Sequence, residues 1–332
     1  MHGTATFAGM FRRVYAEKDA VGYPLAQRVL NRLKNAAFIE IDSYKDIFYR
    51  KRQAFSLQKR SPAIILAVNR DGLISKGSEN CDGFGNENFY SHTSVINCPY
   101  DCEYCYLAAK YPCGHIVIFV NYQESFGVVG DIIQEAPSYF CISYDTDLLA
   151  LEGMTGIVRS WLGFAAKKER LTIEIRSKSA NFNAIEDIEP EPNVILAWTI
   201  SPDVVCEKFE RGAPPLSARL HSARSAIERG WKTRICFDPT LYFDGWRQAY
   251  SNCVKQTFES LSSKDVQEIS VGVFRAPPGA FGKMSSERMA FRALDRVRAE
   301  TGSYNQEGEM ISFMKAKLLE YAREDKIRIF TK

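Results

Sequence analysis

The order of predicted elements indicates an α/β protein built on a partial (β/α)6 barrel. Two patterns support this fold class. Short apolar runs that are typical of buried strands alternate with segments whose apolar residues recur at helical spacing. Strands separated by helices are expected to pair in parallel through right-handed βαβ units. With 332 residues, the chain is long enough for a barrel core, predicted at 91–284, preceded by an accessory segment (1–90) and followed by an extension (285–332).

The accessory segment is predicted to contain one clear helix and one clear strand. After Pro24, apolar residues at Leu25, Val29 and Leu33 follow helical spacing. The run AIILAV at 63–68 indicates a buried strand. A polar, glycine-rich stretch then leads to the predicted core and is expected to be a loop.

The core is predicted as strands and helices in turn. We expect strands at 116–120, 138–143, 171–175, 194–200, 233–237 and 269–274. We expect helices at 147–162, 216–230 and 246–261. The extension is predicted to hold two helices and a short strand at 327–330.

Composition narrows the class of protein without identifying it. The chain is 45% hydrophobic and 25% charged, with a formal net charge of +3, which is mildly basic and does not by itself demand nucleic acid. No apolar run is long enough to span a membrane, and no signal peptide is evident, so a cytoplasmic location is expected. In a reducing compartment, the nine cysteines favour a cluster or a catalytic thiol over disulfides.

The most specific motif is a group of three cysteines with CxxxCxxC spacing. Cys98, Cys102 and Cys105 lie within one stretch rich in tyrosine. Three thiolates suit a [4Fe–4S] cluster that keeps one iron open, and radical S-adenosylmethionine (SAM) enzymes bind SAM at that iron. Tyr106, directly after the last cysteine, could cover the cluster and the SAM adenine.

Zinc is the alternative at this motif. A structural zinc site usually needs four ligands, and Cys81, His92 or Cys113 could supply the fourth. The spacing favours the open cluster, and leaves zinc or unligated cysteines as the other interpretations.

In barrels of this kind, functional residues lie at the carboxyl ends of strands. Cys141 lies near the end of the strand at 138–143, where it could be a small buried hydrophobe or a hydrogen-atom donor. Ser143 and Asp145 follow it, and could cap the next helix or bind the SAM amino group or ribose.

Two later strand ends carry similar residues. Lys178 follows the strand at 171–175, and could be a solvated charge or could bind the SAM carboxylate. Thr199 ends the strand at 194–200 and offers the same choice between a structural and a SAM-binding role.

Several segments, in order along the chain, resemble spore photoproduct lyase, a radical SAM DNA-repair family. The resemblance covers nearly the whole chain, and the cysteine loop is its most specific part. The matching segments are Val14-Tyr15, Gly22–Leu25, Cys98 with Cys102–Leu107, Phe140–Ser143 with Asp145, Phe209–Gly212 with Pro215, Leu216 and Arg219, and Asp238-Pro239 with Tyr242 and Asp244–Trp246.

The resemblance implies a carbon–carbon lyase that repairs 5-thyminyl-5,6-dihydrothymine in UV-damaged DNA. A 5′-deoxyadenosyl radical from SAM would abstract a hydrogen, and a cysteine would return one. It further implies that an electron donor such as a flavodoxin or ferredoxin reduces the cluster. The implied roles are cluster ligation by Cys98, Cys102 and Cys105, hydrogen donation by Cys141, radical relay by Tyr104 and Tyr106, and SAM contacts by Ser143, Asp145, Lys178 and Thr199.

Phosphate contacts to DNA are expected from basic side chains. The candidates are Arg50, Lys51, Arg52, Lys59, Arg60 and the loop at 275–283. The chain also departs from the family pattern. Ser303 stands where the family has the arginine of a Gly-Arg-Tyr run, and Asn97 stands where it has glycine before the first cysteine.

These departures concern the substrate more than the cluster. A divergent radical SAM enzyme of the same fold, acting on another and possibly non-DNA substrate, is therefore an alternative. A non-catalytic protein that binds nucleic acid and carries zinc or a cluster is a second alternative.

Overall fold

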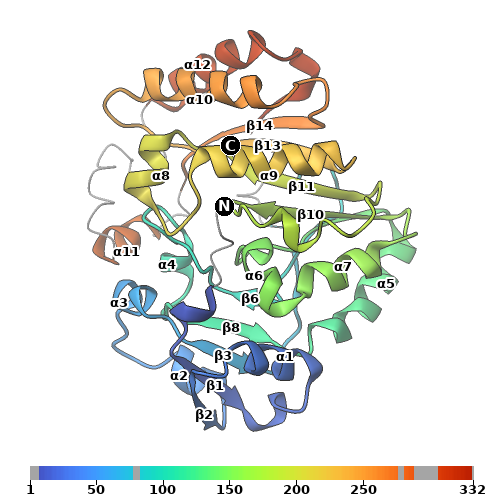
Figure 1. Ribbon diagram of the computed structural model, residues 1–332, viewed down its shortest axis with the longest axis vertical. Coiled ribbons are helices and arrows are strands. Elements are labelled where there is room, and N and C mark those ends of the chain that lie inside the picture. The colour runs from blue at the N-terminus through green and yellow to red at the C-terminus, as the bar shows by residue number, and fades with distance from the viewer. Residues whose placement is uncertain (1–6, 78–82, 276–279, 288–305, 331–332) are drawn as a thin grey trace. The chain divides into compact units, whose positions relative to one another are not determined.

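The computed structural model describes residues 7–77, 83–275, 280–287 and 306–330 (Figure 1). Its contacts divide the chain into two compact units. The first unit runs to residue 99 and resumes at 110–175, and the second comprises 100–109 and everything from 176 onward. The domain boundaries predicted from the sequence stay a prediction.

The first unit contains a five-stranded sheet in the order β2-β1-β3-β8-β6. All neighbours pair in parallel except β6, which runs antiparallel to β8. Every residue of β3 and β8 is buried, which explains why both segments read as continuous apolar runs. The strands are β1 (Arg13–Glu17), β2 (Ala37–Ile41), β3 (Ile64–Ala67), β6 (Val95–Ile96) and β8 (Ile116–Phe119).

A second set of strands in this unit surrounds β9. Strand β9 pairs in parallel with β5 and with β10, and β4 pairs with β5 in the antiparallel direction. The strands are β4 (Ile74–Lys76), β5 (Phe89–His92), β9 (Ser138–Cys141) and β10 (Leu171–Ser177), the last two residues of which belong to the second unit. The helices are α1 (Pro24–Arg32), α2 (Tyr44–Phe48), α3 (Phe55–Arg60), α5 (Ser125–Glu135), α6 (Leu148–Thr155) and α7 (Ile157–Ala165).

The single helix expected at 147–162 is wrong in one respect, because the segment forms two helices. Gly156 separates α6 from α7 and adopts φ +70°. That left-handed conformation ends a helix and is readily adopted by glycine.

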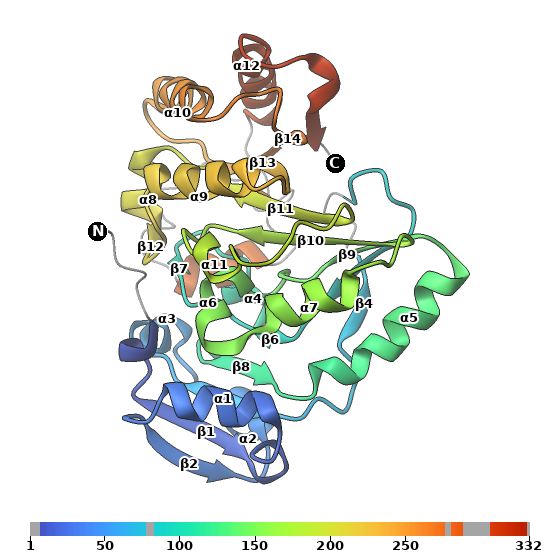
Figure 2. The same ribbon diagram turned by 45° about the vertical axis from the view of Figure 1, so that its right-hand side comes forward.

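The second unit holds strands β11, β13, β14 and β15, neighbours in that order and parallel throughout. In Figures 1 and 2, α10 and α12 lie side by side, and α9 packs on β13. The strands are β11 (Val194–Thr199), β13 (Lys232–Thr240), β14 (Glu268–Val273) and β15 (Ile327–Phe330). The helices are α8 (Asp203–Phe209), α9 (Leu216–Glu228), α10 (Trp246–Ser260), α11 (Ala280–Glu287) and α12 (Glu307–Leu319).

Short elements complete the described chain. A two-stranded sheet consists of β7 (Asp101–Cys102) and β12 (Glu210–Arg211), and α4 spans Leu107–Lys110. The 3-10 helices are Phe7–Met10, Lys18–Ala20, Tyr122–Glu124, Phe182–Ala184 and Glu324–Lys326. Across the described ranges, no helix combines the length and the apolar character that a membrane crossing requires.

Candidate functional site

The cysteine loop of the second unit begins at β7 and leads into α4. Cys102 is buried and Cys105 is half-buried. The backbone N–H of Cys105 donates to the carbonyl of Cys102 at 3.2 Å, so the two cysteines share one tight turn. A turn between the two residues suits a CxxC ligand pair.

A buried ionic network adjoins this loop. Glu210 and Arg219 are both fully buried and form an ion pair. Glu210 also accepts hydrogen bonds from the Tyr104 hydroxyl and, at 2.9 Å, from Ser201 Oγ. Burial by itself would raise the pKa of Glu210, but the positive charges of Arg219 and Lys178 outweigh it and lower the pKa to about 2. Glu210 is therefore a permanent carboxylate acceptor.

Tyr104 is the loop residue that this carboxylate holds. Burial, and then the negative charge of Glu210, raise the pKa of Tyr104 well above its usual range. Its hydroxyl is therefore a neutral O–H donor at every ordinary pH. Tyr106, two residues later, is half-buried, and its carbonyl accepts from the N–H of Ala109 at 2.9 Å.

Lys178 and Thr199 lie beside the same network, just after β10 and at the end of β11. Lys178 is half-buried, and its Nζ lies 5.6 Å from the centroid of the Tyr104 ring. Burial opposes its charge, but Glu210 and Cys102 outweigh burial and raise its pKa, so it is a cation. The carbonyl of Thr199, at the end of β11, accepts from Arg219 Nη1 at 3.2 Å.

Glu210 and Arg219 lie in a segment that matches the family, but the sequence gives them no role. The one signal is that a carboxylate and a guanidinium flank a Gly/Pro-containing stretch. Nothing in the spacing indicated that both would be buried beside Tyr104.

The first unit positions Cys141, Ser143 and Asp145. Cys141 ends β9 and is buried, lying in register with Glu174 of β10 and Ser91 of β5. Ser143 is buried two residues later. The prediction that Cys141 lies at a strand end is therefore confirmed.

Asp145 is held by side chains from two other segments. Its carboxylate accepts from Thr93 Oγ1 at 2.8 Å and from Lys110 Nζ at 2.7 Å. The same ammonium lies 5.2 Å from the ring centroids of both Tyr111 and Tyr144, a cation–π arrangement. The carboxylate is therefore fixed in place, with its charge balanced by Lys110.

The helix-cap alternative for Ser143 and Asp145 is wrong. The N-cap of α6 is Asp147, whose side chain accepts from the N–H of Ala150 at 3.0 Å. Ser143 and Asp145 precede this cap residue in the chain.

Cys98 lies in the first unit, where its carbonyl accepts from the Lys59 ammonium. Lys59 is buried, so its expected role as a DNA phosphate contact is wrong. The preceding residue, Asn97, adopts φ +69°, and its side-chain amide donates to the carbonyls of Cys113 and His115 at 2.7 and 2.6 Å. Asparagine tolerates this left-handed conformation better than most residues, so it can occupy a position that favours glycine.

The donor set fits an iron–sulfur cluster by its chemistry, because its predicted ligands are all thiols and carry no disulfide. Within the described ranges, no three Cys, His, Asp or Glu side chains form a metal-binding group. The assignment of Cys98, Cys102 and Cys105 as ligands therefore stays a prediction.

The possible fourth zinc ligands are differently placed. Burial raises the pKa of Cys113 to about 11, which disfavours the thiolate that a metal needs. His92 is fully buried and hydrogen-bonds Ser125. Cys81, the third candidate, lies outside the described residues. Ser303, which stands where the family has an arginine, also lies outside them.

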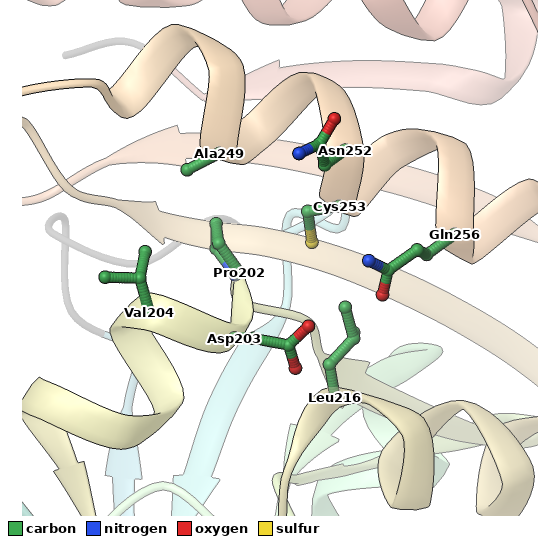
Figure 3. A pocket seen from close by; sticks show the side chains of 8 residues that line it. All are labelled: Pro202, Asp203, Val204, Leu216, Ala249, Asn252, Cys253 and Gln256. Atoms are coloured by element: carbon green, nitrogen blue, oxygen red, sulfur yellow. The ribbon is translucent and has the colours of Figure 1, made fainter.

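A small pocket of about 200 Å³ lies elsewhere in the second unit, between the start of α8 and α10 (Figure 3). Cys253 projects from α10 toward Pro202 and Asp203. Burial raises the pKa of this thiol well above its usual range, so it stays neutral. None of the predicted site residues lines this pocket.

The fold and the cysteine loop define an α/β partial barrel of the radical SAM type. A family model described as spore photoproduct lyase matches residues 86–277, which is more than half of the chain. The chain therefore belongs to the spore photoproduct lyase family.

Individual relatives agree. The spore photoproduct lyase of Clostridium acetobutylicum is 24% identical over 271 residues, covering 78% of this chain and 77% of that protein. A tyrosine-to-phenylalanine mutant of spore photoproduct lyase has a similar structure, with TM-score 0.81 and 17% identity, covering 97% of this chain and 99% of that one. A double mutant with bound AdoMet and dinucleoside spore photoproduct gives TM-score 0.80 at 18% identity, with the same coverage. The predicted fold class is thereby confirmed.

Proposed function

We propose that this chain is a radical SAM lyase that repairs spore photoproduct, 5-thyminyl-5,6-dihydrothymine, in UV-damaged DNA. The observation that carries the proposal is the family match, which spans the cysteine loop, Cys141 and the Glu210 network. The enzyme class follows from the family, and its substrate is proposed on the same ground. Solved relatives hold AdoMet and the dinucleoside lesion.

Cys98, Cys102 and Cys105 would hold the [4Fe–4S] cluster. When bound, the cluster and SAM supply the carbon radical that starts the reaction. Lys178 would pair with the SAM carboxylate, because it stays cationic beside Glu210. Ser143 and Thr199 would form hydrogen bonds with SAM. Asp145 would also bind SAM, through a carboxylate that Thr93 and Lys110 already fix in place.

Cys141 would end the repair. After the bridge between the two thymines breaks, one thymine carries an unpaired electron on its methylene carbon. The Cys141 S–H bond breaks homolytically, its hydrogen atom forms the new C–H bond of the thymine methyl group, and the unpaired electron passes to sulfur. Tyr104 and Tyr106 carry the O–H groups proposed to return a hydrogen atom to that sulfur: the O–H bond breaks homolytically, the S–H bond forms again, and the unpaired electron passes to the tyrosine. Glu210 accepts the hydrogen bond of the Tyr104 hydroxyl.

Lesion binding requires the damaged bases to leave the stack, while the protein holds the flanking phosphates. Arg50, Lys51, Arg52 and Arg60 are exposed and suit such contacts. We further propose a cytoplasmic reaction with a flavodoxin or ferredoxin as electron donor, since a reducing compartment suits a chain whose nine cysteines include a cluster motif.

The test is anaerobic reconstitution with iron and sulfide, followed by reduction and incubation with SAM and DNA containing spore photoproduct. Chromatography would quantify the lesion, thymine and 5′-deoxyadenosine. We expect the lesion to disappear as thymine is recovered. SAM cleavage without repair would indicate another substrate, and a colourless protein with stoichiometric zinc would contradict the radical SAM assignment.

A further inference from the structure

Resting on the proposed function and deepening it, we propose that Glu210 and Arg211 form a clamp that positions the cysteine loop for its cluster. The clamp is β12, which pairs antiparallel with β7 at the start of the loop. Both are positioning residues, since they act on the loop and not on the substrate.

The backbone half of the clamp grips the loop on either side of Cys102. Glu210 lies in register with Cys102, and Arg211 lies in register with Asp101. Beyond the paired residues, the N–H of Glu103 donates to the carbonyl of Phe209 at 2.7 Å. The segment that carries the buried cysteine is therefore held at consecutive residues.

The side-chain half acts on two faces, because successive side chains of a strand point in opposite directions. Glu210 reaches the interior, where it accepts from Tyr104. Arg211 is more than half exposed and donates to Asp101 Oδ2 at 3.0 Å and to Glu103 Oε1 at 2.9 Å. One guanidinium thus bridges the two acids that flank Cys102.

Those two acids explain why the bridge matters. The side chains of Asp101 and Glu103 are only 8% and 6% exposed. A buried carboxylate without a cation or donor is costly. Without Arg211, the two acids would repel each other across Cys102. A loop conformation that turns them toward water would then be lower in free energy than the one observed.

The clamp has a rigid base in the same unit. Arg219 of α9 donates to the carbonyls of Pro214 and Thr199 at 2.8 and 3.2 Å, as well as to Glu210. A fully satisfied buried network of this kind is rigid. It therefore fixes the ligand-bearing turn before a cluster binds, which reduces the ordering cost of assembly.

The experiment compares Arg211→Ala and Arg211→Lys with the wild type. Arg224→Ala is the matched control, since Arg224 is exposed on α9 and pairs with Glu228 at 3.9 Å. Hydrogen exchange of the 100–109 backbone is measured in the cluster-free protein. Iron and sulfide content, and the electron paramagnetic resonance spectrum of the reduced cluster with and without SAM, are measured after anaerobic reconstitution.

We expect exchange at 101–104 to be about tenfold faster in Arg211→Ala, as loss of two partly exposed charge-assisted hydrogen bonds implies. Cluster content should fall and the spectrum should change, with partial rescue in Arg211→Lys and no effect in the control. Glu210→Gln is less useful, because it leaves the buried Arg219 charge unpaired and risks unfolding.

Two results would overturn the clamp. Unchanged exchange in Arg211→Ala would show that the bridge does not hold the loop. Faster exchange with wild-type cluster content and spectrum would show that it holds the loop without serving the cluster. A wild-type protein that takes up no iron would instead contradict the proposed function, and with it the cluster role of the clamp.

Discussion

At the scale of single residues, His92 is the clearest source of pH dependence. It is fully buried, its Nε2 hydrogen-bonds Ser125 Oγ at 2.7 Å, and its ring packs edge-on against Trp161. Burial lowers the pKa of His92 to about 3. The unfolded chain binds a proton near pH 6.5, whereas the folded chain does not, so stability is lost as the pH falls below 6.5.

We expect His92 to remove about 2 kcal/mol of the free energy of unfolding between pH 6.5 and 4.5. Denaturant unfolding of the wild type and of His92→Gln across this range would measure it, since glutamine can place a polar nitrogen near Ser125 without titrating. The wild-type curve should fall more steeply. The exposed His221 supplies the control variant, His221→Gln, which should follow the wild type. Parallel curves for wild type and His92→Gln would contradict the prediction.

At the scale of elements, two glycines near the junction between α6 and α7 are expected to affect stability in opposite directions. Gly156 needs φ +70°, and an added Cβ would come within 2.9 Å of the Arg28 side chain. Gly153 lies inside α6 and has open space around it. Gly156→Ala should therefore destabilise the protein by about 1–2 kcal/mol. Gly153→Ala should stabilise it by about 0.5–1 kcal/mol.

Thermal and denaturant unfolding of the two variants would measure this contrast. Equal effects in both would mean that the left-handed turn is not required.

The same junction shows a feature that apolar periodicity in the sequence does not predict. The apolar spacing across 147–162 is correct for each helix, but the break depends on one glycine whose backbone angle the spacing does not encode.

Other elements were predicted well, for an equally physical reason. Strands β3, β8 and β11 are buried almost throughout, and their uninterrupted apolar runs are visible in the sequence. Short polar strands such as β7 and β12 have no such signal, because their pairing joins residues about a hundred positions apart. The clamp on the cysteine loop was therefore missed, although both of its segments had been singled out.

The candidate site also contains features that the sequence predicts and features that it does not. The strand-end rule correctly located Cys141 and Thr199, because it depends on topology alone. The sequence does not show which individual charged side chains are buried. Lys59, in a basic run, is buried against the carbonyl of Cys98, whereas its neighbour Arg60 is exposed. Charge patterning thus identified the basic segment without assigning a role to each of its members.

At the scale of the whole molecule, the decisive prediction concerns how the reaction ends. Cys141→Ala removes the proposed hydrogen donor and leaves the predicted cluster ligands and SAM contacts in place. We expect the variant to bind iron and cleave SAM but to convert the lesion mainly to trapped or off-pathway products instead of thymine. Chromatography of the nucleosides, with 5′-deoxyadenosine measured in the same sample, would quantify both outcomes.

Cys236→Ala is the matched control for this change. Cys236 is another buried cysteine on a parallel strand, but it has no proposed part in the reaction. Both variants remove one buried sulfur, at a similar cost in packing of about 1 kcal/mol or somewhat more. A general loss of stability should therefore affect both, whereas diversion of the product should occur in Cys141→Ala alone. Clean recovery of thymine by Cys141→Ala would remove this cysteine from the mechanism and require a different hydrogen donor.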